Sequence, residues 1–314
     1  MSGSLPNGVE GIHGRIHLKR FIAGLACAAA AGLAVPTLAS AAHAQAPADP
    51  LAALQGKLGA GRGVSFSDSL KLAEGKKRTV VITRKGVLQF GGSGVVASDH
   101  TSRPRIKSSD LDELVVAGQN SYDENSKAFA KALNGIAKPE RTVRMKNVSY
   151  ISGGMFGEFL PEGKKWVRYP GSINGVLDSL GGLQPQLVNA AEPGTLKALL
   201  AHAVKQPGGY TGKISLGELH KVSPWFRASM PLKPTGAQAE QVLSWRLSVG
   251  PDGLPTRLTS TYAVGGSSSS VTMETDYSGW GAKVSVKAPP AGEVVAFEDL
   301  DLDAADVPVP LLAK

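Results

Sequence analysis

The strongest constraint on the fold is a run of alternating apolar and polar residues from Val242 to Ala288. Alternation with a period of two places one set of side chains on each face of a β-strand. Turn-forming sequences at 251–253, 265–266 and 278–281 divide the run into four predicted strands of an antiparallel meander. One face of the meander is apolar and needs a cover. The residues predicted on that face include Leu243, Trp245, Leu247, Leu258, Tyr262, Val271 and Met273.

The first 44 residues have the pattern of a secretory signal peptide. Basic residues precede position 21, residues 21–41 are almost wholly apolar, and Ala42-His43-Ala44 fits the small-x-small rule for cleavage after Ala44. We therefore expect residues 1–44 to be removed and the mature protein to be secreted or extracytoplasmic. A single-span anchor is the alternative, but the apolar run is weakly hydrophobic and Pro36 interrupts it.

Cys27 is the single cysteine of the chain and falls inside the apolar run. Lipidation at Cys27 is an alternative to a cleaved leader, although Gly24-Leu25-Ala26 lacks the aliphatic residue that a lipobox has three positions before its cysteine. Cleavage after Ala44 leaves a mature chain with no thiol. Disulfides, thiol chemistry and thiolate metal sites are then excluded.

The mature chain is moderately basic, with 31 lysines and arginines against 25 acidic residues after residues 1–44 are removed. The densest cluster is Glu74-Gly75-Lys76-Lys77-Arg78. Such a balance favours weak attraction to anionic polymers or lipid headgroups, and the possible partners are envelope lipoproteins or a membrane surface. No aromatic-basic motif of nucleic-acid recognition is present, so nucleic acid is not expected as a partner. We expect a monomer.

The remaining residues, about 270 in number, suit one large domain. We assign residues 45–50 to a tether, 51–294 to the domain and 295–314 to a flexible C-terminal extension. A short helix is predicted from Leu51, strands at 64–72, 79–83, 87–90 and 94–97, and a polar loop at 101–110. A helical stripe that ends at Lys138-Pro139 follows, and then strands at 142–151, 155–159, 165–169 and 210–216.

Two short amphipathic helices between Ile173 and Val204 have the size needed to cover the apolar sheet face. Gly181-Gly182 and Pro193-Gly194 interrupt this region and would permit movement of the cover. An apolar loop at 223–235 lies near the predicted mouth. The residues predicted to face the sheet are Val176, Leu177, Leu180, Leu196 and Leu199 from the helices, and Phe226 and Met230 from the loop.

Motifs for catalysis and for metal or cofactor binding are absent from the sequence. His100, His202 and His220 are far apart, and neither His100 nor His220 has two further candidate ligands nearby. No serine lies in a G-x-S-x-G motif and no glycine-rich phosphate loop is present. We expect no cofactor, no metal and no enzymatic activity. A hydrolase triad assembled in space around one of the histidines stays open.

Two physical interpretations of the covered sheet fit the same sequence periodicity. In one, the helices pack tightly and the interior is an ordinary filled core. In the other, the sheet curls into a half-barrel, the helices form a lid, and an apolar ligand such as an acyl chain occupies the space between them. Sequence alone leaves open whether the cavity is filled or hollow.

Several turns and strand ends resemble the LolA-like envelope lipid carriers, in particular the LppX/LprG-type lipoproteins. The likeness spans roughly Ala48 to Val294 and involves Trp245-Arg246-Leu247-Ser248-Val249, Pro251-Asp252-Gly253-Leu254-Pro255, the segment 275–290 and Phe159-Leu160-Pro161-Glu162-Gly163. The resemblance implies an α+β fold, a LolA-like curved antiparallel half-barrel with a lid of short helices around a cavity for lipid. It implies no catalytic residue. One departure is the lack of a lipobox cysteine.

The resulting hypothesis is a secreted, non-enzymatic carrier or sensor of an apolar ligand. The first alternative is a cell-envelope interaction module of the same fold with a filled core. The second is a secreted hydrolase, which requires a serine within hydrogen-bond reach of a histidine.

Overall fold

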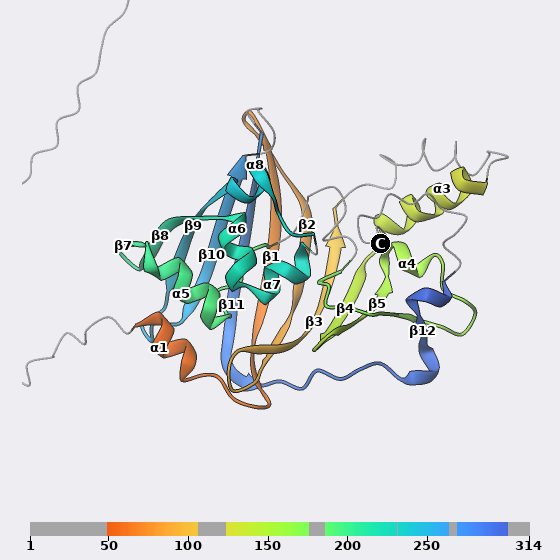
Figure 1. The fold of residues 1–314 in the computed structure, drawn as a ribbon, viewed down its shortest axis with the longest axis horizontal. Helices are drawn as coiled ribbons and strands as arrows, with labels where there is room; N and C mark the ends of the chain where they lie inside the picture. Colours follow the sequence, from red (N-terminus) through yellow and green to blue (C-terminus); the bar gives the residue numbers. More distant parts are fainter. Residues whose placement is uncertain (1–48, 106–123, 176–185, 231, 264–268, 301–314) are drawn as a thin grey trace, which may run out of the picture. The chain divides into compact units, whose positions relative to one another are not determined.

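Strands from both halves of the chain form one curved, open sheet in the described residues (Figure 1). The strand order is β12-β6-β5-β4-β3-β2-β1-β11-β10-β9-β8-β7. Neighbours are antiparallel except β6 and β12, which run parallel. The bounds are β1 Arg62–Glu74, β2 Lys77–Phe90, β3 Val95–Pro104, β4 Glu140–Met145, β5 Val148–Gly153, β6 Trp166–Tyr169, β7 Val204–Gln206, β8 Gly209–Ser215, β9 Val242–Val249, β10 Pro255–Ala263, β11 Ser269–Lys283 and β12 Val294–Ala296.

This structure, a computed structural model, describes residues 49–105, 124–175, 186–230, 232–263 and 269–300. The helices within these ranges are short, and an open antiparallel sheet covered by short helices confirms the predicted fold class. Their bounds are α1 Pro50–Gln55, α3 Glu124–Ile136, α4 Gly154–Gly157, α5 Pro193–Ala201, α6 Leu216–Val222, α7 Pro224–Ser229 and α8 Gly236–Glu240, with 3-10 turns η2 Ala291–Glu293 and η3 Phe297–Asp299.

Two apolar clusters lie on the covered face of the sheet. The larger one joins β1, β2 and β8–β11 to α1, α5, α6, α7 and the segment 187–191. The smaller one joins β5 and β6 to α3 and α4, with Leu300 from the C-terminal segment. A third cluster contains Val143 and Trp166, whose register places them on the opposite face, where Val286 packs against them. The sheet is therefore covered on one face by two separate groups of helices.

The C-terminal meander has three of the four predicted strands. β9, β10 and β11 are confirmed, but the predicted turn at 278–281 lies within β11, which continues to Lys283 and pairs with β1. Gly279 and Gly281 have φ angles of 69° and 79°, and such left-handed glycines bend a strand without reversing it. The predicted fourth strand is wrong, because residues 284–287 form no strand and Val286 packs on the opposite face.

Further predictions of local structure are wrong. The single strand predicted at 142–151 is two strands, β4 and β5, joined by a turn at 146–147. Residues 155–159 are not a strand, because the positive φ angles of Gly153 and Gly154 turn the chain into α4. The loop predicted at 223–235 contains α7, which begins at Pro224 and is capped by the Ser223 hydroxyl, the acceptor for the Phe226 N–H. Serine before proline is a strong helix start. The predicted polar loop at 101–110 is also corrected in part, since β3 extends to Pro104.

The structure describes only part of the predicted helical cover between Ile173 and Val204. α5 confirms the second predicted helix, and Pro193-Gly194 forms its first turn rather than a hinge between elements. Ile173 is buried in the smaller cluster without helical structure. The predicted lid residues Val176, Leu177 and Leu180 lie outside the described residues.

The predicted C-terminal boundary at residue 294 is too early. β12 pairs with β6, and Phe297 makes edge contacts with Phe156 and Tyr169 at centroid distances of 5.5 and 5.2 Å. Leu300 is buried in the same cluster. Residues 295–300 are therefore part of the fold, and the rest of the predicted extension lies outside the described residues.

Candidate functional site

The residues predicted to line a ligand space lie together in the larger apolar cluster. Sheet, α5 and α7 side chains pack against one another there, while Tyr262 and Met230 lie at its margin and are partly buried. The fully packed members are Leu243, Trp245, Leu247, Leu258, Val271, Met273, Leu196, Leu199 and Phe226.

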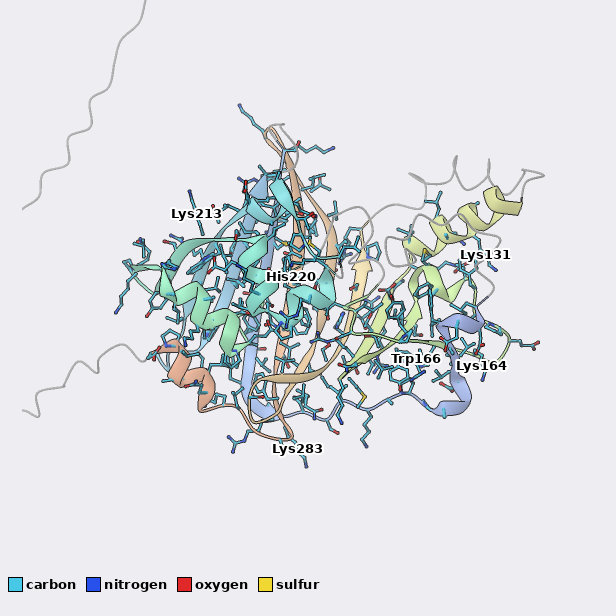
Figure 2. The ribbon with its side chains drawn as sticks, in the orientation of Figure 1. Lys131, Lys164, Trp166, Lys213, His220 and Lys283 are labelled. Atoms are coloured by element: carbon cyan, nitrogen blue, oxygen red, sulfur yellow. The ribbon has the colours of Figure 1, made fainter. Side chains whose placement is uncertain are left out.

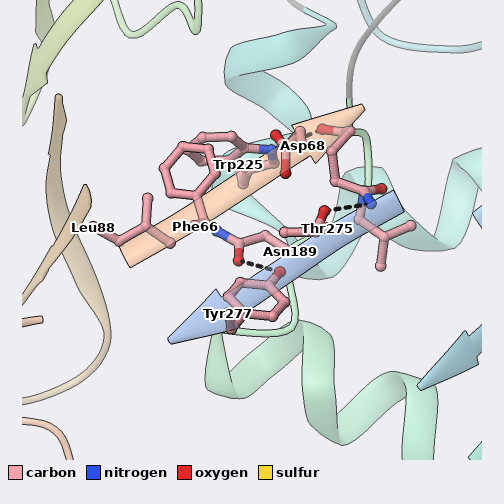
Figure 3. A pocket seen from close by; sticks show the side chains of 9 residues that line it. Phe66, Asp68, Leu88, Asn189, Trp225, Thr275 and Tyr277 are labelled. Atoms are coloured by element: carbon pink, nitrogen blue, oxygen red, sulfur yellow. Dashed lines mark hydrogen bonds between the residues drawn. The ribbon is translucent and has the colours of Figure 1, made fainter. Parts of the chain in front are cut away.

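The space between the sheet and the helices is almost filled in this conformation. A cavity of about 10 Å³ lies there, with room for about one water molecule (Figure 3). Pockets for small ligands usually measure roughly 300–1,000 Å³. The cavity is lined by Phe66, Asp68, Leu88, Gln186, Val188, Asn189, Trp225, Thr275 and Tyr277.

A larger recess lies where β1 ends and β2 begins. Its volume is about 210 Å³, and its walls are Leu72, Lys77, Thr79 and Val81. Leu72 and Val81 pack against the larger apolar cluster. The recess therefore adjoins the apolar interior. A second recess of about 530 Å³ includes Tyr210 and Val249, which also pack against the larger apolar cluster.

A band of polar side chains crosses the covered face at the middle of the sheet. The register aligns Thr275 with Asp68, Asp68 with Arg84, Arg84 with Ser102 and Ser102 with Glu140. Residues directly opposite one another share a face of the sheet. All five side chains are buried. Burying ionisable side chains inside a covered sheet costs free energy unless those side chains are paired.

Asp68 and Arg84 form the ion pair of this band. The Arg84 Nε donates to Asp68 Oδ2 at 2.8 Å, and the two side chains are 1% and 0% exposed. Burial raises the pKa of the Asp68 carboxyl, and the positive charge of Arg84 opposes that rise. The pair is therefore held in a low-dielectric interior, where each charge depends on the other.

Trp225 of α7 lies between two buried arginines. The Arg84 guanidinium carbon is 5.0 Å from the centre of the indole ring, and that of Arg144 is 5.1 Å from it. The indole N–H donates to the Gln186 carbonyl at 2.9 Å. Cation–π contacts of this kind strengthen when they are desolvated. Trp225 is thus the side chain through which the helical cover contacts the charged part of the sheet.

Glu192 connects α5 to α7. Its carboxylate accepts from the Thr195 and Ser223 hydroxyls at 2.8 and 2.5 Å and from the Trp225 backbone N–H at 2.8 Å. Burial is the main cause of a raised pKa for this carboxyl, opposed by the hydrogen bonds and the nearby Arg144. One buried carboxylate therefore fixes the starts of both helices.

Replacing Glu192 by glutamine should change the pH dependence of stability. Because the pKa is raised on folding, the folded state binds more protons than the unfolded state above the unfolded value of about 4.3. The contribution of Glu192 to stability therefore decreases as the pH rises through that value towards the folded pKa. Urea unfolding of both proteins over a pH series should show the wild type losing free energy of unfolding relative to Glu192→Gln.

The matched control for this pH series is Glu298→Gln, which changes an exposed carboxylate in η3. A wild-type advantage over Glu192→Gln that grows with pH would contradict the raised pKa.

The three histidines do not form a serine-based catalytic site. His100 is buried, and its Nε2 lies 2.9 Å from the Asn174 carbonyl oxygen. His220 lies on α6 in the helical cover (Figure 2), and His202 is exposed at the end of α5. In the part of the chain that the structure describes, no serine hydrogen-bonds to any of them. The hydrolase alternative gains no support from this geometry.

Several buried polar atoms on the covered side have no hydrogen-bond partner within the described ranges. They are Asp68 Oδ1, Ser98 Oγ, His100 Nδ1, Asn174 Oδ1, Asn189 Nδ2 and Trp245 Nε1. Buried polar groups are normally satisfied, so a cluster of such atoms requires an explanation. Asp68 and Asn189 both line the small cavity, where Tyr277 and Gln186 donate to Asn189 and Thr275 (Figure 3). The interior therefore has unused hydrogen-bonding capacity.

Two features are absent from the described residues. No group of three or more histidine, cysteine, aspartate or glutamate side chains is arranged to hold a metal ion there. No helix in these ranges has both the length and the apolar character needed to cross a membrane.

Sequence reasoning missed the polar band. Asp68, Arg84 and Ser102 occur in strands that alternate only partly, and nothing in their spacing shows that they lie side by side. A signal that could have found them is the presence of a charged residue where an inward-facing apolar one is expected in consecutive strands.

The chain matches no protein-family model and no curated protein. The solved structures that are similar to it at low identity include the following two. A LolA superfamily protein from Nitrosomonas europaea aligns with 76% of this chain and 93% of its own, at 8% identity and a TM-score of 0.30. A DUF1329 family protein from Desulfovibrio piger aligns with 74% and 92%, at 10% identity and a TM-score of 0.27. Neither is named as an LppX/LprG-type lipoprotein, so that finer resemblance stays a prediction.

Proposed function

We propose that this protein is a secreted, non-enzymatic carrier or sensor that binds an acyl chain or lipid between β9–β11 and the helices α5–α7. The observation that carries the proposal is the continuity of the apolar cluster with the recess at Leu72 and Val81. An acyl chain that enters there meets the apolar side chains of the larger cluster.

Binding would require the helical cover to move. The present cavity of about 10 Å³ is too small for a hydrocarbon chain, and Trp225 and Phe226 of α7 fill the space beside it. α5 and α7 have nine and six residues, and such short helices owe their stability to packing. The ligand would replace their side chains against the sheet, with buried apolar area contributing roughly 25 cal/mol per Å².

The alternative function is a cell-envelope interaction module with a filled core. The small volume of the cavity favours this alternative, because a core that stays filled needs no ligand. The two functions differ in one property, namely whether the interior opens to admit an acyl chain.

A titration with a fluorescent fatty acid separates the two functions. The carrier predicts saturable binding, and Leu72→Asp should weaken it about tenfold, because a charge replaces an apolar wall of the recess. The matched control is Val80→Asp on the same hairpin, at a site that is 37% exposed and pairs with Lys71 on the opposite face. Absence of saturable binding by the wild type would favour the interaction module.

A further inference from the structure

Arg144 on β4 is a buried cation that lies against the aromatic side chain of the helical cover. It is 6% exposed, and its guanidinium contacts the face of the Trp225 indole. Burial lowers the pKa of Arg144 to about 10, with Glu192 opposing and Arg84 adding to the effect, so the group stays charged at neutral pH. A guanidinium offers five N–H donors, so Arg144 can donate hydrogen bonds to an anionic oxygen that comes within reach.

Two polar atoms beside Arg144 are unpartnered. Ser98 is directly opposite Arg144 in the register, and His100 follows two residues later on the same face of β3. Both are buried, and the Ser98 Oγ and His100 Nδ1 atoms make no hydrogen bond within the described residues. A buried cation thus lies on the same face as two buried polar atoms that have no hydrogen-bond partner there.

The protonation of His100 defines what this group of side chains can bind. A carbonyl oxygen only accepts, so the contact with Asn174 requires the proton on Nε2 of His100. Burial and the two nearby arginines lower the pKa of His100, which keeps the ring neutral with an accepting lone pair on Nδ1. Arg144 therefore donates, His100 accepts, and the Ser98 hydroxyl can do either.

Trp225 contacts two of these three side chains, His100 and Arg144. Its ring centre lies 6.1 Å from that of His100 and 5.1 Å from the Arg144 guanidinium carbon. The displacement of α7 that an acyl ligand needs would therefore expose this group and open it towards the apolar cluster. An anionic oxygen would then replace the indole face as the partner of Arg144.

We infer that Arg144, Ser98 and His100 form a subsite for the head group of an acidic amphiphile that carries an anionic oxygen and a neighbouring hydroxyl. This inference rests on the proposed function and specifies its ligand. The anionic oxygen accepts from Arg144 and Ser98, the hydroxyl donates to His100 Nδ1, and the acyl chain lies in the apolar half. Hydrogen bonds to a charged group in such a setting change affinity by about 10- to 100-fold.

The test compares two lipids with the same acyl chain, lysophosphatidic acid and monoacylglycerol. Each competes with a fluorescent fatty acid bound to the wild type, to Arg144→Met and to the control Arg246→Met, which removes an exposed arginine from the other face of β9. We expect the phosphate lipid to bind the wild type and Arg246→Met at least about tenfold more tightly than monoacylglycerol. Arg144→Met should bind the two lipids equally.

The outcomes separate the head-group subsite from the proposed function. If neither lipid binds the wild type, the proposed function fails and the subsite fails with it. If both bind equally, or if Arg144→Met keeps the preference for the phosphate lipid, the subsite is overturned while the carrier stands.

Inorganic phosphate should compete at least about tenfold more weakly than the phosphate lipid. Equal competition by inorganic phosphate and the phosphate lipid would show that the subsite binds free anions, and it would overturn the assignment of an amphiphile as the ligand. Arg144→Lys and Ser98→Ala, checked for native circular dichroism, should retain part of the preference.

Discussion

Replacing Arg84 by methionine should lower the free energy of unfolding by about 3–5 kcal/mol. The substitution leaves the Asp68 carboxylate buried without its cation and removes the cation–π contacts of Arg84 with Phe66 and Trp225. This is the largest effect that we expect from a single charge in the molecule. Urea unfolding followed by far-UV circular dichroism at neutral pH measures it.

A double variant provides the control for the ion pair. Asp68→Leu together with Arg84→Met removes both charges, and apolar replacement of a whole buried pair is often neutral or stabilising. The double variant should therefore recover most of the loss caused by Arg84→Met. A cost below about 1 kcal/mol for Arg84→Met, the range of an exposed pair, would show that the pair is not buried in solution.

Replacing Trp225 by alanine should cost about 3–5 kcal/mol of stability and strengthen acyl-chain binding. Trp225 is 2% exposed and fills the space between the arginines and the small cavity. Its removal enlarges the interior, and the ligand no longer has to displace the indole. Thermal unfolding measures the first effect, and fatty-acid titration measures the second.

The matched control is Trp166→Ala on the opposite face of the sheet (Figure 2). Trp166 is also buried, so its loss should reduce stability without strengthening acyl-chain binding. A gain in affinity from Trp166→Ala would show that loss of stability alone admits the ligand. Weaker binding by Trp225→Ala than by the wild type would show that Trp225 is a binding residue rather than an obstacle.

The C-terminal half of the fold was predictable because its signals are local. In β9, Leu243, Trp245 and Leu247 alternate with polar residues, and the burial of each follows that alternation. Pro251-Asp252-Gly253 marks the turn into β10 without ambiguity. The error at 278–281 has a local cause too, since glycines at positive φ occur both in turns and in bulged strands.

The polar interior was not predictable because it depends on long-range register. Arg84 lies opposite Ser102, and Ser102 lies opposite Glu140, although a whole helix separates the last two in the chain. A charged residue in a partly alternating strand is ordinarily assigned to the solvent face. Trp225 was missed for another reason, because prolines around it favoured a loop.

The periodicity of the sequence could not predict the volume of the interior. Leu196, Phe226 and Met273 are apolar and inward-facing whether they line a hollow or fill it. Here they fill it. The difference between a carrier and a filled-core module therefore lies in whether α5 and α7 separate from the sheet, which is a property of packing energies and not of pattern.

Native mass spectrometry of the gently purified protein tests the central claim most directly. If the covered half of the sheet opens to bind an amphiphile, part of the protein should carry an added mass of one lipid, released on denaturation and identified as an acidic amphiphile. A mass equal to that of the polypeptide alone, from protein that also fails to take up added fatty acid, would contradict the account.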